Sequence, residues 1–168
     1  MTELTQPAGR TRHRIPLHTY LDYRLGRNQP WWRQTYNVLV RPLAAPSLAE
    51  FWRTWNPVWG YYLSVWCYRP VRRVLPHAVA VMVTFTVSGL VHNLLAILLS
   101  HRLNPFVTVW FMLYGVVMVA SEALHMDLSR LPAPARILVN LAYLIGCYKL
   151  VSPLLPWFQL CMAGDQQC

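Results

Sequence analysis

Three long apolar stretches, separated by short polar links, dominate the second part of the chain. They cover residues 77–99, 106–124 and 136–158. At about 1.5 Å per residue, each is long enough to cross the roughly 30 Å hydrocarbon core of a bilayer as a helix. The links between them contain prolines and charged residues, which are typical of helix ends. The pattern predicts an all-α integral membrane protein in which residues 77–168 form a transmembrane helical bundle.

The chain before residue 77 has a different pattern. Residues 1–30 are polar, rich in Arg and His, and without a helical period, so we expect a flexible or surface-lying arm. Residues 31–76 mix Trp, apolar residues and Arg in stretches too short to span a bilayer. They are expected to form interfacial amphipathic helices. Residues 31–168 would then make one partial membrane domain.

An aromatic stripe runs through this interfacial segment. Pro57 interrupts it, because proline disfavours the α conformation in the residue before it and suits the first position of a new helix. Asn56 is then expected to be the N-cap of the second piece. Tryptophans in such a stripe commonly anchor a protein at the membrane interface. The stripe residues fall at offsets 0, 3, 7, 10, 11 and 14, on one face of a helix: Trp52, Trp55, Trp59, Tyr62, Leu63 and Trp66.

Charge is sparse and unevenly distributed. Charged residues make up 12% of the chain and apolar residues 55%, which argues against a soluble domain. Eleven of the fifteen Lys and Arg residues precede residue 77. Because basic residues accumulate on the cytoplasmic side, the N-terminus is predicted to be cytoplasmic and the C-terminus to lie on the opposite side. Arg interleaved with Trp beside apolar spans favours an anionic membrane surface, and not nucleic acid, as the partner.

The four cysteines do not predict a metal site. Cys67 and Cys147 lie in apolar surroundings and are expected to be small core residues. Cys161 and Cys168 could be free thiols or a disulfide. No cysteine stands at the Cys/His spacing of a zinc site, and residues 1–10 show no secretory signal.

A few polar residues lie inside the predicted spans, where transfer of a polar or ionisable side chain into the hydrocarbon core costs free energy. His92 lies well inside the first span, and Thr84 and Ser88 precede it by eight and four residues on the same face. This face could line a functional cavity or simply supply hydrogen bonds between helices, and both interpretations stand. Lys149, in the third span, either snorkels to the surface or lines the same cavity as His92. Glu122 lies too far along the helix axis to pair with Lys149.

Two motifs resemble those of a known family. SLAEFWRTWNPVWGYYL at residues 47–63 resembles the FW…WN segment of the membrane-bound O-acyltransferases, and FTVSGLVHN at residues 85–93 is similar to their F-x-x-SG-x-x-H segment. Residues 109–122 resemble the wax synthase-like branch, which has an aromatic-rich helix with a Gly and a terminal Glu. The resemblance covers residues 45–125 and is to the carboxyl-terminal half of such an enzyme. Pro57 and Asn93 depart from the branch pattern.

The resemblance implies transfer of a fatty acyl group from acyl-coenzyme A to a lipid or other hydroxyl acceptor, as in a wax ester synthase. On this basis His92 matches the catalytic histidine, which takes the proton of the acceptor, and Asn56 matches its conserved asparagine partner. Beyond acyl-coenzyme A as co-substrate, no cofactor or metal is expected. The substrate-binding residues would include Trp52, Trp55, Trp59, Ser88 and Lys149.

The family's enzymes usually contain more spanning helices than this chain provides. We therefore expect the chain to act as a homo-oligomer or with a partner membrane subunit. The alternative is a non-catalytic, truncated membrane subunit or interaction protein that kept the motifs. The identity of the acceptor and the length of the acyl chain stay open.

Overall fold

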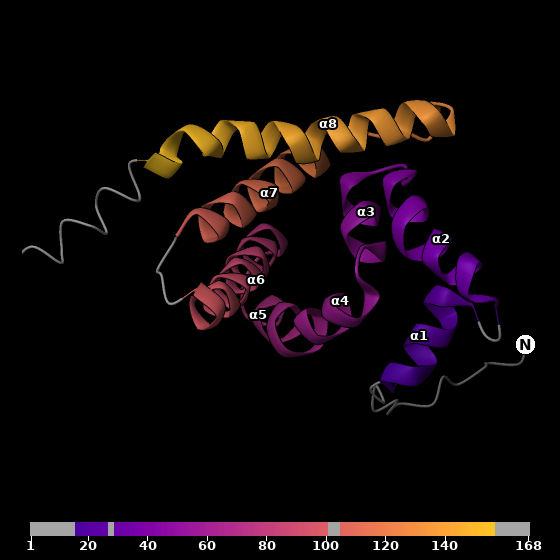
Figure 1. The fold of residues 1–168 in the computed structure, drawn as a ribbon, viewed down its shortest axis with the longest axis horizontal. Coiled ribbons are helices and arrows are strands. Elements are labelled where there is room, and N and C mark those ends of the chain that lie inside the picture. Colours follow the sequence, from indigo (N-terminus) through magenta and orange to yellow (C-terminus); the bar gives the residue numbers. More distant parts are fainter. Residues whose placement is uncertain (1–15, 27–28, 101–104, 157–168) are drawn as a thin grey trace, which may run out of the picture.

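The computed structural model describes residues 16–26, 29–100 and 105–156, and the regular structure within these residues is helical (Figure 1). Short helices come first: α1 (Leu17–Leu25), α2 (Trp31–Leu43), α3 (Leu48–Thr54), α4 (Pro57–Leu63) and α5 (Arg69–Arg72), with a π-helical turn over Ser64–Tyr68. Long helices follow: α6 (His77–Ser100), α7 (Phe106–Ala123) and α8 (Ala133–Val151), which a 3₁₀ turn over Ser152–Leu154 extends.

The long helices confirm the predicted spans. His77–Leu98, Phe106–Ala123 and Ala133–Leu154 are each long and apolar enough to cross a membrane. Helix α8 begins at Ala133, three residues before the predicted start. Pro134 is tolerated in the first helical turn, because a backbone N–H at that position would have no intrahelical acceptor. Residues 157 and 158, at the end of the predicted third span, lie outside the described residues.

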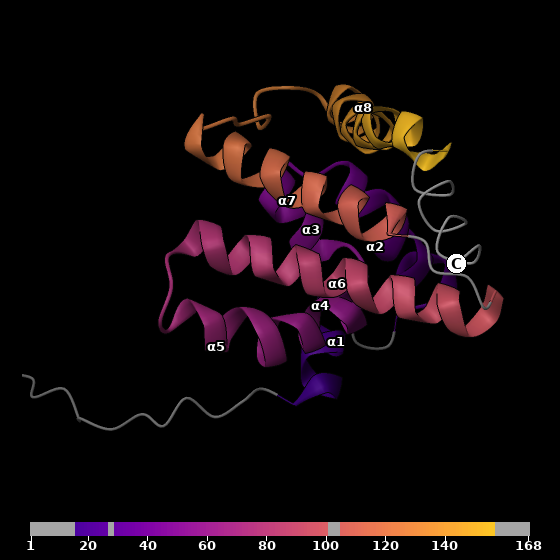
Figure 2. The same ribbon diagram turned by 90° about the vertical axis from the view of Figure 1, so that its left-hand side faces the viewer.

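Helices α6 and α7 form an antiparallel pair, and α8 crosses them steeply. In Figure 2, α6 and α7 run across the view while α8 is seen nearly end-on. In Figure 1, α8 instead runs along the length of the view. The bundle of spans is therefore a crossed packing and not a set of parallel rods.

Helices α6 and α7 approach each other closely at Gly89. A Cβ atom at Gly89 would lie 2.8 Å from the Cα atom and 3.2 Å from the carbonyl oxygen of Thr108. Small residues allow this close backbone approach between membrane helices.

We expect Gly89→Ala to lower the melting temperature of the detergent-purified protein. The added methyl group would push α7 away, and such overpacking costs about 1–3 kcal/mol. Gly146→Ala on α8 is the matched control, because nothing lies within 4 Å of the Cβ atom it adds. An unchanged melting temperature for Gly89→Ala would contradict the close packing.

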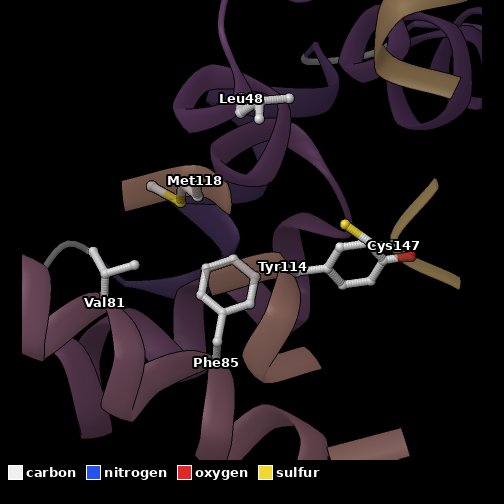
Figure 3. Close-up of a cluster of buried hydrophobic side chains, with 6 residues drawn as sticks. All are labelled: Leu48, Val81, Phe85, Tyr114, Met118 and Cys147. Carbon is white, nitrogen blue, oxygen red and sulfur yellow. The ribbon is translucent and has the colours of Figure 1, made fainter. Parts of the chain in front are cut away.

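The apolar core lies where α3 meets α6, α7 and α8 (Figure 3). Trp52 of α3 packs against this core, with its ring 5.0 Å from the ring of Phe85 in a T-shaped contact. Its indole Nε1 donates a hydrogen bond to the hydroxyl of Tyr143 on α8, at 2.9 Å. The core residues are Leu48, Val81, Phe85, Tyr114, Met118 and Cys147.

The cysteine predictions have different outcomes. Cys147 is buried, as predicted, whereas Cys67 is only half-buried, because its turn lies at the edge of the core. Both are free thiols. Cys161 and Cys168 lie outside the described residues.

A buried asparagine fastens the short helices to α8. Asn140 is fully buried, and its Nδ2 donates hydrogen bonds to the carbonyl oxygens of Leu43 at 2.6 Å and Ala45 at 3.1 Å. The N–H of Leu128 adds a bond of 2.8 Å to the carbonyl oxygen of Pro46. These contacts hold the link between α2 and α3 against the first half of α8 and the loop that precedes it.

Helix α1 lies within the segment predicted to be a flexible or surface-lying arm. The rings of Tyr20 and Tyr61 lie 5.4 Å apart, which packs α1 on α4, and Arg24 lies 3.9 Å from Glu50 of α3. These tertiary contacts favour a helix that the sequence pattern of residues 1–30 did not predict. Residues 1–15 lie outside the described residues.

The aromatic stripe also does not remain a single face. The chain turns between α3 and α4, so that Trp52 packs into the core while Trp66 is 76% exposed. Only part of the stripe is therefore available to anchor the protein at an interface.

Candidate functional site

A cavity of about 460 Å³ lies between α3, α4, the π-helical turn and α6. We call it the α6 cavity. It follows α6 from His77 to His92, which are fifteen residues or about 22 Å apart along the helix. Phe111, Met118 and Glu122 of α7 complete this wall. Two of the predicted site residues, Asn56 and His92, therefore line the same cavity although they lie far apart in the sequence.

Asn56 lies at the turn between α3 and α4. Its φ of 42° and ψ of 76° are left-handed, a conformation that asparagine adopts more readily than most residues. Its Oδ1 accepts a hydrogen bond of 3.2 Å from the backbone N–H of Trp59, so Asn56 caps α4 as predicted. Because the cap uses the oxygen, and no described residue accepts from the Nδ2 amide group, this residue of the cavity lining keeps a free donor.

His92 lies at the end of the α6 cavity opposite His77. Its Nδ1 is 2.7 Å from the carbonyl oxygen of Ser88. A carbonyl oxygen can only accept, so Nδ1 carries a proton, and in the neutral ring Nε2 is a free acceptor. The ring stacks on Phe111 with centroids 4.8 Å apart. The residue is nevertheless exposed in this chain, so one side of its site is open.

Trp59 connects Asn56 with His92. Its backbone N–H bonds to Asn56, and its indole Nε1 donates to the hydroxyl of Ser88 at 2.9 Å. Its ring meets His92 in a T-shaped contact, with centroids 5.5 Å apart. Ser88 itself is only 3% exposed. The structure thus brings together Asn56, Trp59, Ser88 and His92 from the predicted set.

The other predicted residues have different positions. Trp52 and Trp55 also line the cavity, although Trp52 bonds to Tyr143 and Trp55 stacks on Phe51 with centroids 5.3 Å apart. Lys149 is exposed on α8 and is not among the residues that line the cavity. The structure therefore does not bring Lys149 to His92.

The opposite end of the α6 cavity holds a hydrogen-bonded chain that sequence analysis missed. Nε2 of His77 lies 2.8 Å from a carboxylate oxygen of Glu122, and Nδ1 lies 2.9 Å from the hydroxyl of Tyr68. Because a carboxylate only accepts, Nε2 donates to Glu122, and Nδ1 of the neutral ring accepts from Tyr68. The sequence does contain a signal for this contact. In an antiparallel pair of spans, the start of the first span, at His77, and the end of the second, at Glu122, lie at the same depth in the membrane.

Cations also line the α6 cavity, contributed by Arg24, Arg53 and Arg69. Arg53 is bound to Glu50 at 2.8 Å, whereas Arg69 forms no ion pair with any residue that the structure describes. Within the same described part of the chain, no group of three or more His, Cys, Asp or Glu residues is placed to hold a metal ion.

The link from Trp59 through Ser88 to His92 predicts a positioning effect. Ser88→Ala would leave the indole N–H of Trp59 without its acceptor and loosen the ring that contacts His92, at a cost of about 1–3 kcal/mol. We expect a lower kcat with little change in KM in any reaction that His92 carries out.

Trp59→Phe keeps an aromatic ring and removes the same N–H, so the double variant should be no worse than the more impaired single variant. Kinetics of the four proteins in this double-mutant cycle test the link. Fully additive losses would contradict it.

The segment that contains these site residues is similar to known proteins. A family model described as the membrane bound O-acyl transferase family matches residues 32–114, which include Asn56, Trp59, Ser88 and His92. This half of the chain belongs to the membrane bound O-acyl transferase family. The resemblance drawn from the two sequence motifs is thereby confirmed.

A relative within this O-acyl transferase family is a long-chain-alcohol O-fatty-acyltransferase from Simmondsia chinensis. The two sequences are 42% identical over an alignment of 92 positions, and the match covers 48% of this chain and 26% of that enzyme. The match thus spans about a quarter of the relative's length. No solved structure gives a significant match.

Proposed function

We propose that the α6 cavity is the acyl-transfer site of a membrane O-acyltransferase, in which a fatty acyl group passes from acyl-coenzyme A to a hydroxyl acceptor. One observation carries the proposal. His92, with a free imidazole nitrogen, and Asn56, with a free amide donor, line the same cavity, and Trp59 contacts both side chains. The family match and the relative named for long-chain alcohols support it.

The two side chains have complementary parts in this reaction. The acceptor hydroxyl gives its proton to Nε2 of His92 while its oxygen bonds to the thioester carbonyl carbon. Negative charge then gathers on the carbonyl oxygen, where the Nδ2 group of Asn56 can donate a hydrogen bond. Collapse of this intermediate breaks the carbon–sulfur bond. The departing thiolate takes the proton from His92, which leaves an ester, coenzyme A and a neutral imidazole.

The lining of the cavity supports a long, partly anionic donor. Apolar side chains such as Val81 and Phe85 line its middle. Arg24, Arg53 and Arg69 line the wall, and their charge exceeds that of the two nearby carboxylates, Glu122 and the Glu50 that Arg53 binds. A phosphate-bearing carrier with an apolar acyl chain matches both features.

The open side of the cavity favours a second candidate function. Acyl transfer is most efficient where water is excluded, and His92 is exposed in this chain. Lipid, a second copy of the chain or another protein must therefore cover it during catalysis. If no cover forms, the chain is a non-catalytic subunit that retains the site.

Incubation of the purified full chain, in lipid nanodiscs, with a radiolabelled long-chain acyl-coenzyme A and hexadecanol tests the proposal. We expect ester and free coenzyme A to form in equal amounts. Protein that inserts correctly and binds the acyl donor but forms no ester would contradict the enzymatic function and support the non-catalytic one.

A further inference from the structure

A second cavity lies on the other side of α3, between α2, the link that follows it and the beginning of α8. Its volume is about 660 Å³, and it shares no lining residue with the α6 cavity. We call it the α2–α8 cavity. It lies where the candidate span α8 starts, at the level where a spanning helix meets the headgroups. Its lining residues are Tyr36, Arg41, Ala44, Ala45, Pro46, Ser47, Glu50, Thr54, Ala133 and Arg136.

Two arginines give the α2–α8 cavity an uncompensated positive charge. Neither Arg41 nor Arg136 forms an ion pair with a described residue. The one carboxylate in the lining, Glu50, lies 2.8 Å from Arg53 and 3.9 Å from Arg24. The cavity therefore offers two guanidinium groups that no described acidic residue neutralises.

The guanidinium of Arg136 also has a buried donor without an acceptor. Its Nε atom is inaccessible and makes no hydrogen bond with any residue that the structure describes. A buried N–H that lacks an acceptor is costly, and a charged oxygen from a ligand would satisfy it. Ala133, which starts α8, lines the same cavity, and the N–H groups of a first helical turn likewise have no intrahelical acceptor. Both features favour a ligand with anionic oxygens.

An independent feature points to lipid as the source of that ligand. Helix α2 exposes an aromatic and apolar face made by Trp31 (78% exposed), Trp32 (53%), Tyr36 (55%) and Leu39 (50%). These residues, at offsets 0, 1, 5 and 8, lie on one side of the helix. Trp and Tyr collect at the headgroup level of a bilayer. Tyr36 belongs both to this face and to the lining of the α2–α8 cavity, so the cavity opens beside a membrane-binding surface.

We propose that the α2–α8 cavity binds the phosphate of an anionic phospholipid headgroup, with Arg41 and Arg136 as its ligands. Arginine suits this task because its planar donors pair with two phosphate oxygens at once. The acyl chains of the lipid would then lie along the exposed aromatic face of α2. This site is separate from the proposed acyl-transfer reaction and does not depend on it.

Thermal unfolding of the detergent-purified full chain tests this site. Phosphatidylglycerol should raise the melting temperature of the wild type, because a ligand that binds only the folded state stabilises it. Phosphatidylcholine and inorganic phosphate are the comparison probes and should have a much smaller effect. A rise with inorganic phosphate equal to that with phosphatidylglycerol would overturn the assignment to a lipid.

Arginine variants test whether phosphatidylglycerol binds in the α2–α8 cavity. Arg41→Gln and Arg136→Gln should each bind phosphatidylglycerol about tenfold more weakly, as measured by native mass spectrometry, since each loses a charged hydrogen bond. Arg73→Gln is the matched control, because Arg73 is exposed and lines neither cavity. Arg41 is exposed, so its replacement tests the site even if Arg136→Gln folds poorly. Undiminished binding by Arg41→Gln would overturn the proposal.

Discussion

Replacing His92 with alanine is expected to abolish most acyl transfer while the protein still folds and inserts. The variant removes the only described imidazole nitrogen that is both unprotonated and unpaired at the α6 cavity, since His77 uses both of its ring nitrogens. Loss of a general base typically slows a reaction roughly 10²–10⁴-fold. The fall should appear in kcat, measured as ester formed from labelled acyl-coenzyme A and a long-chain alcohol.

Controls separate this effect from misfolding. His18→Ala changes an exposed histidine of α1 that does not line the cavity, and its kcat should match that of the wild type. Added imidazole should restore part of the activity of His92→Ala, because His92 lies at an open side of the cavity. A kcat for His92→Ala within twofold of wild type would eliminate His92 as the base.

Replacing Asn56 with aspartate is expected to separate the structural and chemical roles of this residue. Aspartate keeps an oxygen to cap α4 and tolerates the left-handed backbone, but an ionised carboxylate has no N–H to donate. Removing one hydrogen-bond donor from a developing oxyanion typically costs roughly 10²–10³-fold in kcat. Asn56→Asp should therefore keep the melting temperature of the wild type and lose activity by that factor.

Asn56→Ala is the companion variant. It removes the cap as well as the donor, which costs about 1 kcal/mol of stability, so it should lose both melting temperature and activity. If Asn56 serves only as a cap, Asn56→Asp would be as active as the wild type. That outcome would remove Asn56 from the chemistry and leave it with a structural role.

Local sequence rules predicted the features that depend on neighbours along the chain. The apolar length of α6, α7 and α8 defines the spans without reference to tertiary packing. The cap at Asn56 follows from the proline that comes next and from a side-chain oxygen that reaches three residues ahead. An ionisable residue is energetically costly in the middle of a span, and this alone marks His92 as a candidate functional residue.

Local sequence rules do not predict features that depend on contacts between residues far apart in the sequence. Trp52 has the periodicity of an interface anchor, yet its position is decided by Tyr143, which lies 91 residues away in the chain. Asn140 carries no sequence signal for the two backbone carbonyls that it satisfies. The free-energy cost of a lysine inside a span is the only sequence feature that links Lys149 to His92. Helix α8 crosses the α6–α7 pair steeply (Figure 2). Lys149 on this helix is exposed and does not line the α6 cavity.

The most direct test of the α6 cavity is photo-crosslinking with a long-chain alcohol that carries a diazirine next to its hydroxyl group. If the acceptor binds between Asn56 and His92, labelled peptides should contain residues 56–59 and 88–92, and unmodified long-chain alcohol should compete with the labelling. Labelling confined to lipid-exposed side chains of α8, such as Leu138 and Leu150, would contradict the placement of the reaction in this cavity.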